Sequence, residues 1–481
     1  MHRFVALAAC VATVLPASVA HAQDAPPAAD SGPVTTLRAA LRHAYRTNPG
    51  LTAARAGLRA IDEGVPIAKA AARPTLSATA DYQEYVLTSA NSLSAPSRAF
   101  AANGNLSFPL FQGGRVANSI RAADARVESG RSNLRATEAD VFNAIVSVYM
   151  DVLRDEAIVQ LNTRNVTVLA TNLQASRDRF EVGDLTRTDV AQSEARLSLA
   201  RGQLQAAQAQ LIASRENYIR FVGLVPGQLA YPAPLPGLPG SAEQATAIAL
   251  GGNPLLDAAR TDAQAAGYDV RVARAARLPR LSAVGSSGYN NYLGSLTSSL
   301  PGRTFLQSQT SATIGLSATI PLYQGGLPGA QVRRAQALHG QSLEQVTLVE
   351  RRIVAEVRAA FARHRAALEL IRSAEDAVAA NTLAVEGVRA ELTVGTRNVL
   401  DVLNAEQELL NARVQLVTAR RDAYVAAFGL LVAMGQAEAH DLGLFSSGGK
   451  SSHDEPLRSA ASPSTVDGGV PRMALPNSLT Q

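Results

Sequence analysis

The chain has 481 residues, a formal net charge of +5, 47% hydrophobic residues and a single cysteine. The charge is mild for this length, and Lys and Arg are interspersed with Asp and Glu, which favours solvated helix faces over a nucleic-acid-binding stripe. We therefore expect no nucleic acid among the partners. The sequence has no Gly-rich phosphate loop, no nucleophile elbow and no His pair at metal-ligand spacing. We therefore predict neither enzyme activity nor a cofactor or metal site.

Residues 1–22 have the pattern of a secretory signal peptide. Arg3 precedes the apolar run Phe4 to Val14, and Ala20-His21-Ala22 ends in small residues before Gln23. Lipidation at Cys10 is the alternative, although too few apolar residues precede it for an ordinary signal core. We favour cleavage after Ala22, followed by a flexible segment at 23–34.

The rest of the sequence contains one unit twice. Pro109-Leu-Phe-Gln-Gly-Gly114 returns as Pro321-Leu-Tyr-Gln-Gly-Gly326, and Asn48-Pro49 returns as Asn253-Pro254. The offset between copies is 205 residues before the strands and 212 after them. We expect a first structural repeat at 35–223, a Pro- and Gly-rich linker at 224–245, a second repeat at 246–445 and a disordered tail at 446–481.

Each copy contains a predicted helical hairpin, at 114–222 and 327–435. Only one glycine and no proline occur between Arg115 and Glu181, so this helix would be about 100 Å long. An isolated antiparallel coiled coil would explain the hairpins equally well. Each return helix covers about half of its outgoing partner. We therefore expect the short helices near 51–72 and 255–276 to stack end to end with the return helices.

Each copy also contains a predicted strand pair, at 74–112 and 279–324. The clearest strand, Ala312 to Leu322, alternates apolar with small polar residues, which suits either a soluble sandwich or an outer-membrane barrel. Four strands leave two open edges, which a bilayer does not permit, whereas three chains would supply twelve strands. The predicted fold class is mainly α with a small β part, with four transmembrane strands per chain in a trimeric twelve-stranded barrel continued by an α-helical barrel.

With the repeated strand exits, Phe180-Glu-Val-Gly-Asp-Leu-Thr-Arg-Thr-Asp-Val190 and Val394-Gly-Thr-Arg-Asn-Val-Leu-Asp-Val402, the chain resembles the TolC family of outer-membrane ducts. This resemblance implies a homotrimer in the outer-membrane lipid of a Gram-negative bacterium, with a long periplasmic extension. It also implies a periplasmic adaptor and an inner-membrane transporter of the ABC, RND or MFS type as partners. The cargo would be small toxic molecules or unfolded proteins.

The resemblance assigns roles at the hairpin turns. Asp189 and Arg397 would gate the tip, and Asp401 and Asn404 would lie where the pore narrows. The adaptor contacts would be Val182, Gly183, Asp184, Leu185, Val394, Gly395 and Thr396. Helix capping is the alternative role for Asp189 and Asp401, because Thr186 and Asn398 each precede an acid by three residues. Leu392 stands where relatives with a closed tip carry a tyrosine, and Asn404 replaces a second acidic ring.

The alternative function is a soluble periplasmic coiled-coil adaptor or scaffold of a transport system. It accounts for the hairpins but not for strands suited to lipid. The sequence leaves the cargo and the pump type open. The turn at Val394 to Val402, together with the poor lipidation signal, favours the branch used for protein secretion as well as efflux.

Overall fold

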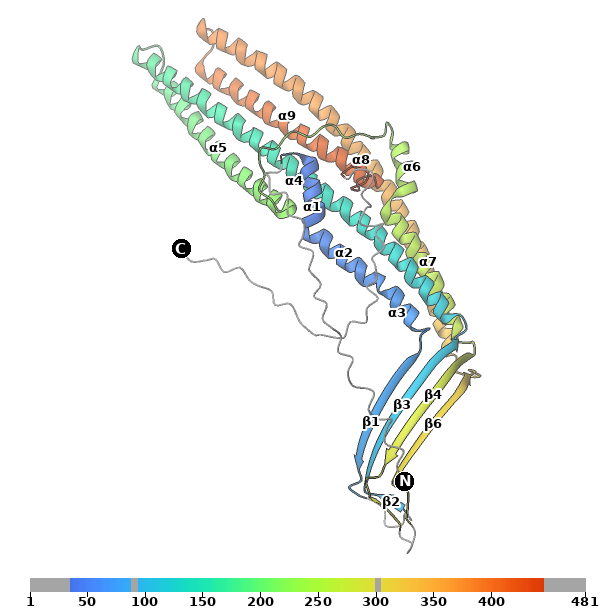
Figure 1. Cartoon of the computed structure of the whole chain (residues 1–481). Coiled ribbons are helices and arrows are strands. Elements are labelled where there is room, and N and C mark those ends of the chain that lie inside the picture. Colours follow the sequence, from blue (N-terminus) through green and yellow to red (C-terminus); the bar gives the residue numbers. More distant parts are fainter. Residues whose placement is uncertain (1–34, 88–93, 299–303, 445–481) are drawn as a thin grey trace.

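The computed structural model of the chain describes residues 35–87, 94–298 and 304–444. The predicted signal peptide, the segment 23–34, Cys10 and the tail at 446–481 lie outside these residues. Long helices occupy one end of the molecule and a small sheet the other, with a bend where they join (Figure 1). The fold is mainly α-helical with an antiparallel sheet, which confirms the predicted fold class. No helix in the described part of the chain is long and apolar enough to span a membrane.

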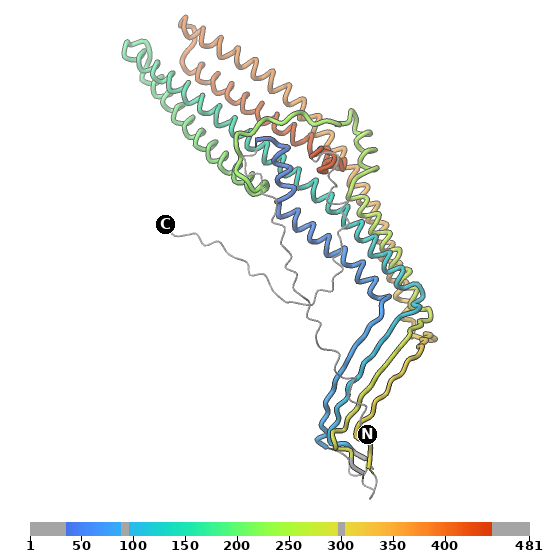
Figure 2. Tube along the Cα trace, in the orientation of Figure 1, coloured from blue at the N-terminus to red at the C-terminus, as the bar shows by residue number. Residues whose placement is uncertain are grey.

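The two copies have the same order of elements, except that the single helix α7 stands where the first copy has α2 and α3. The first copy consists of α1 (Leu37–Thr47), α2 (Pro49–Asp62), α3 (Gly64–Ala70), β1 (Thr75–Glu84), β2 (Ser94–Pro96), β3 (Arg98–Phe111), α4 (Arg115–Glu181) and α5 (Arg187–Val222). The second consists of α6 (Ala242–Gly252), α7 (Pro254–Ala275), β4 (Arg280–Asn291), β5 (Leu296–Ser298), β6 (Ser308–Thr319), α8 (Leu327–Thr393) and α9 (Val399–Met434). Figure 2 traces both copies from strand into long helix.

Paired glycines redirect the chain from each strand into its long helix. Gly113 and Gly114 have φ of 60° and 77°, and Gly325 and Gly326 have 57° and 81°. This left-handed conformation costs glycine little. A Cβ on Gly113 would also lie 2.7 Å from Cβ of Leu278, so glycine allows the second copy to approach closely.

The short helices stack on the return helices, as predicted from their lengths. Asn48 caps α2 through its side-chain oxygen, and its Nδ2 donates a 2.9 Å hydrogen bond to the carbonyl of Phe221 near the end of α5. In the second copy Asn253 caps α7 and donates to the carbonyl of Ala433 at 3.0 Å. Both asparagines are buried. In each copy, one asparagine side chain therefore joins the end of the return helix to the start of the short helix stacked on it.

The main hydrophobic core lies around the middle of α4, where α1, α5 and α9 meet it. Phe142, Ile145 and Tyr149 of α4 pack with Tyr218 of α5 and Phe428 of α9, all fully buried or nearly so. The Tyr149 hydroxyl donates a 2.6 Å hydrogen bond to the Ala230 carbonyl in the linker. The linker between the copies is thereby held against the long helix.

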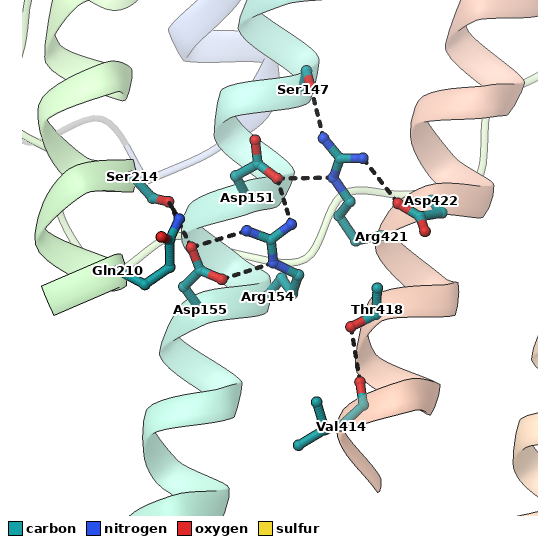
Figure 3. Close-up of polar contacts among 10 residues, drawn as sticks. All are labelled: Ser147, Asp151, Arg154, Asp155, Gln210, Ser214, Val414, Thr418, Arg421 and Asp422. Atoms are coloured by element: carbon teal, nitrogen blue, oxygen red, sulfur yellow. Dashed lines mark hydrogen bonds and ion pairs between the residues drawn. The ribbon is translucent and has the colours of Figure 1, made fainter. Parts of the chain in front are cut away.

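A partly buried ionic cluster connects three helices beside this core (Figure 3). Arg154 of α4 binds Asp151 at 3.0 Å and Asp155 at 2.7 Å. Ser214 of α5 donates a 2.5 Å hydrogen bond to Asp155, which is 2% exposed. Arg421 of α9 reaches Asp151 at 2.9 Å. The cluster thus connects the first hairpin to the second.

The second copy has no equivalent of this cluster. At the offset of 212 residues, Asp151, Arg154 and Asp155 correspond to Arg363, Ala366 and Ala367. The second hairpin is therefore connected to the first through α9, and α8 carries no corresponding cluster on its own face.

The four long strands form one antiparallel sheet in the order β1-β3-β4-β6. β2 and β5, which the sequence did not predict, form a separate pair. β1–β3 and β4–β6 have the same register, since Leu76 pairs with Leu106 and Leu281 with Ala318. β6 ends at Thr319, earlier than predicted, because its partner β4 begins at Arg280 and Pro321 cannot donate to the ladder.

The register separates the sheet into an apolar and a polar face. Ser77, Asn105, Ser286 and Thr313 form one row of the polar face. The apolar face carries Leu76, Tyr82, Phe100, Leu106, Phe108, Tyr289, Ile314 and Leu316. Ile314 is 96% exposed in the isolated chain, so this face has no protein covering within the described residues.

Candidate functional site

The two hairpin turns, at the end of the molecule opposite the sheet, are built alike. After α4, Val182 ends the helix and Gly183 takes a left-handed φ of 81°. The N–H of Asp184 then donates to the Arg179 carbonyl at 2.9 Å, and the two side chains pair at 2.6 Å. The remaining turn residue, Leu185, packs partly buried against the apolar cluster at this end.

The second turn repeats this backbone with different side chains. Gly395 has φ of 79°, and Thr396 donates to the Glu391 carbonyl at 3.0 Å through both its N–H and its hydroxyl. Val182 and Val394 are 79% and 74% exposed. Each turn therefore presents an apolar side chain to solvent at the far end of a hairpin.

Asp189 and Asp401 complete the capping boxes of the helices that follow the turns, whose N-cap residues are Thr186 and Asn398. Asp189 accepts from the N–H and hydroxyl of Thr186 at 2.9 and 2.7 Å, which lowers the pKa of its carboxyl group. The N–H of Asp401 donates to Asn398 at 2.9 Å, and the Asp401 carboxylate accepts in return. The capping alternative is thus confirmed for both residues, and a further role in gating or in the pore stays a prediction.

Within the chain, Arg397 does not pair with Asp189. Its Nε donates to Glu391 at 2.8 Å and a terminal nitrogen lies 3.9 Å from Asp401. The pKa of Arg397 is raised, chiefly by its hydrogen bond to Glu391. A bond between Arg397 and Asp189 of a neighbouring copy remains a prediction.

Asn404 has a partner that sequence reasoning missed. Arg196 of α5 donates a 2.6 Å hydrogen bond to its side-chain oxygen and so joins the two return helices. Asn404 lies three residues after Asp401, on the same side of α9.

Each hairpin also contains an ion pair between its two helices. These are Arg177–Glu194 and Arg389–Glu406, at positions that correspond at the offset of 212 residues. The internal repeat could have revealed this pair, because the same two charges recur at the same spacing.

Leu392 stands at the position where relatives with a closed tip carry a tyrosine. It lies at an apolar cluster that joins the two hairpins near the turns. It packs partly buried with Leu185 against a core made of Leu169, Leu173, Leu197, Ala200, Val399 and Leu403. The leucine therefore contributes to packing at the position where a phenol would offer a hydrogen bond. The described residues contain no cluster of His, Cys, Asp or Glu suited to a metal ion.

Paired long hairpins joined to a small sheet with one apolar face define an exit duct of the outer membrane. The family model described as outer membrane efflux protein matches residues 40–223 and 246–436, and the chain belongs to this family. It is an outer-membrane channel of the efflux and type I secretion class, located in a Gram-negative outer membrane. This is a family of channels and not of enzymes.

Relatives and a solved structure agree with this assignment. Outer membrane efflux protein BepC of Brucella suis is 35% identical over 410 residues, 85% of this chain and 87% of BepC. Outer membrane protein TolC of Escherichia coli is 28% identical over 309 residues, 62% of this chain and 61% of TolC. The crystal structure of the Campylobacter jejuni CmeC outer membrane channel shares the fold, with a TM-score of 0.71 at 18% identity over 84% of this chain and 86% of that one. The resemblance to the TolC family is confirmed.

Proposed function

We propose that three copies close one barrel and one periplasmic tunnel, and that this trimer exports cargo received from an inner-membrane pump. The observation that carries the proposal is the sheet, in which β1 and β6 are open edges and one face is apolar. A bilayer does not tolerate unpaired edges, and membrane barrels have at least about eight strands. Three four-stranded sheets supply twelve strands.

The height of the apolar face supports a membrane position. Phe100 and Phe108 lie eight residues apart on the same face of β3, which corresponds to about 27 Å of strand. The apolar band of outer-membrane barrels is about 25 Å tall, with aromatic residues at its borders. The polar rows would then line the lumen.

We further propose that the turns bind a periplasmic adaptor, which connects the duct to an ABC, RND or MFS transporter. The exposed valines would insert into the adaptor, while Gly183 and Gly395 keep the turns narrow. The transporter would supply the energy, because the sequence contains no nucleotide-binding loop. Both toxic small molecules and unfolded proteins suit a tunnel of this kind.

Replacing Val182 and Val394 together with aspartate tests the adaptor contact. We expect export to fall strongly while conductance in planar bilayers and the yield of trimer stay unchanged, because both side chains lie in solvent. Drug resistance or protein secretion in a strain lacking the native duct gives the readout, and Val225→Asp, at a site 70% exposed and away from the turns, is the control. Full export by the double variant would argue against these contacts. A product that fractionates as a monomer without detergent would overturn the duct itself.

Replacing Asp401 with alanine tests the pore constriction. Three copies of this carboxylate around a narrow lumen would attract multivalent cations, so the variant is expected to show weaker block by divalent and trivalent ions. Single-channel recordings across a range of cation concentrations measure the block. Glu344→Ala removes an equal charge from α8, far from the turns, and should leave block unchanged. Equal block in Asp401→Ala and the parent would remove Asp401 from the pore.

A further inference from the structure

Cations gather where α7 and α8 meet the sheet, and acids are missing there. No Asp or Glu occurs from Val270 to Leu343, whereas Arg271, Arg274, Arg277 and Arg333 all fall in this stretch and are exposed. The ion pairs found among the described residues involve none of the four. The Arg271 guanidinium lies 5.3 Å from the centre of the Tyr268 ring, a neutral partner.

Two of these guanidinium groups converge on one point. A Cβ built on Gly329, in the first turn of α8, would lie 3.5 Å from Nη1 of Arg333 and 3.6 Å from Nη2 of Arg277. Two like charges side by side without a counter-charge are unfavourable. An anion at this glycine would relieve the repulsion, and a phosphate offers several acceptor oxygens for two guanidinium groups.

The sheet determines which side of the helix layer is which. Tyr85, in line with the polar-face residues of β1, donates its N–H to Ser97 beside β3. For L-residues this direction places β3 to the right of β1 for a viewer facing the polar side with the helices below. The strand order continues rightward through β4 to β6. The helices below therefore run α3, α4, α7, α8 from left to right.

The cations lie on the other side, below the apolar face. In α7, which rises toward β4, Asp269 pairs with Arg126 of α4 on the left and Gly267 adjoins His339 of α8 on the right. Because the α-helix is right-handed, Tyr268 then turns away from this viewer, and Arg271 lies between Tyr268 and the side facing α8. A groove on that side is lined by Arg271, Arg274, Tyr268, Gln336 and His339. Arg333 and Gly329 lie on the same stripe of α8 as Gln336, about one and two turns earlier in the helix.

The first copy extends the same surface. At the repeat offsets Arg274 corresponds to Lys69 and Arg333 to Arg121, and both are exposed. Arg333 lies six residues into α8, only about 9 Å along the helix from the strand exit. Lipid headgroups occupy a zone of roughly 5–8 Å beyond the hydrocarbon core. The cations thus lie at headgroup height, next to the lipid-suited face of the sheet.

We propose that this outward basic surface, centred on Arg277 and Arg333 beside Gly329, binds the phosphate groups of anionic phospholipids in the periplasmic leaflet of the outer membrane. The proposal rests on the membrane position of the sheet given under Proposed function. Its partner is a lipid and not the cargo, because the polar face and the lumen lie on the opposite side. Bound anionic lipid would fix the height of the duct in the membrane.

Lipid binding to the intact, detergent-purified protein tests this proposal. Phosphatidylglycerol and phosphatidylcholine with identical acyl chains are titrated, and the lipids retained are counted by native mass spectrometry. The parent is expected to retain phosphatidylglycerol preferentially. The quadruple variant Arg271→Gln, Arg274→Gln, Arg277→Gln and Arg333→Gln should lose affinity by roughly fivefold per cation at low salt. The matched control replaces Arg351, Arg358, Arg363 and Arg365, exposed arginines farther along α8, with glutamine.

Equal retention of both lipids by the parent, or the same loss in the control as in the variant, would overturn the proposal. Displacement of phosphatidylglycerol by inorganic phosphate at an equal concentration would also contradict it, because the surface would then recognise a free anion. Planar-bilayer conductance of the quadruple variant separates this proposal from the channel function. If the parent shows no lipid preference but the variant conducts like the parent, the lipid site is contradicted and the channel function is not.

Discussion

Replacing Gly435 with alanine is expected to destabilise the protein by several kcal/mol, whereas the same change at Gly223 costs only about 1 kcal/mol. Both glycines end a return helix in the left-handed conformation, with φ of 75° and 86°, so both variants carry the same backbone cost of about 1 kcal/mol. At Gly435 the new Cβ would lie 2.9 Å from Asn253 Cα and Pro254 Cδ, which are atoms at the start of α7. Overpacking of this kind adds about 1–3 kcal/mol.

Thermal and denaturant unfolding of the detergent-solubilised protein measures the difference between the two variants. Gly223 is the matched control because the nearest atom to its built Cβ is His43 Nε2, at 4.0 Å. Equal destabilisation of the two variants would show that the joint between α9 and α7 is looser than the one described above. A variant that fails to accumulate at Gly435, beside a well-folded Gly223→Ala, agrees with the expectation.

Replacing Arg397 with serine is expected to open the tip and produce a several-fold rise in time spent at high conductance. The change removes the bond to Glu391 and the weaker one to Asp401, and it would also remove the predicted bond to Asp189 of a neighbouring copy. Single-channel recording in planar bilayers measures the effect. Unchanged conductance would count against a gate at this position.

Three further variants separate the partners of Arg397. Glu391→Gln tests the bond within the chain, and Asp189→Asn removes the charge while keeping an oxygen that can cap α5. If the gate is a bond between copies, Asp189→Asn should raise conductance, and the double variant with Arg397→Ser should add little to either change alone. Effects that simply add would show that Asp189 and Arg397 act independently, and a gain in Glu391→Gln alone would place the gate within one chain.

The features that could be predicted from the sequence are those repeated at short range. The run from Arg115 to Glu181 lacks helix breakers, and strict alternation from Ala312 identifies the apolar face of a strand. The stacking of α2 on α5 also followed from lengths alone. The end of β6 was missed because it depends on where β4 begins, which the alternation of β6 does not encode.

Side-chain partners far apart in the sequence could not be predicted. Asp151 and Arg421 belong to different hairpins, and nothing in either local pattern indicates that they meet. Glu391 was missed as the partner of Arg397 because the two side chains lie on opposite sides of a turn whose backbone had to be known first. Arg277 and Arg333 each look like ordinary solvated arginines until the fold places them beside one glycine.

The ionic cluster around Arg154 lies far from the hairpin turns, so a small rotation of the helices at the cluster would become a larger displacement at the turns. From Asp155 to the end of α4 the helix runs on for about 39 Å, so a rotation of about 5° at the cluster would displace the turn by about 3 Å. The second hairpin is held in this way on one flank only, since its own positions there carry Arg363, Ala366 and Ala367. In a ring of three chains, contacts between hairpins that have the ionic cluster would alternate with contacts that lack it. The aperture would therefore widen with threefold and not sixfold symmetry.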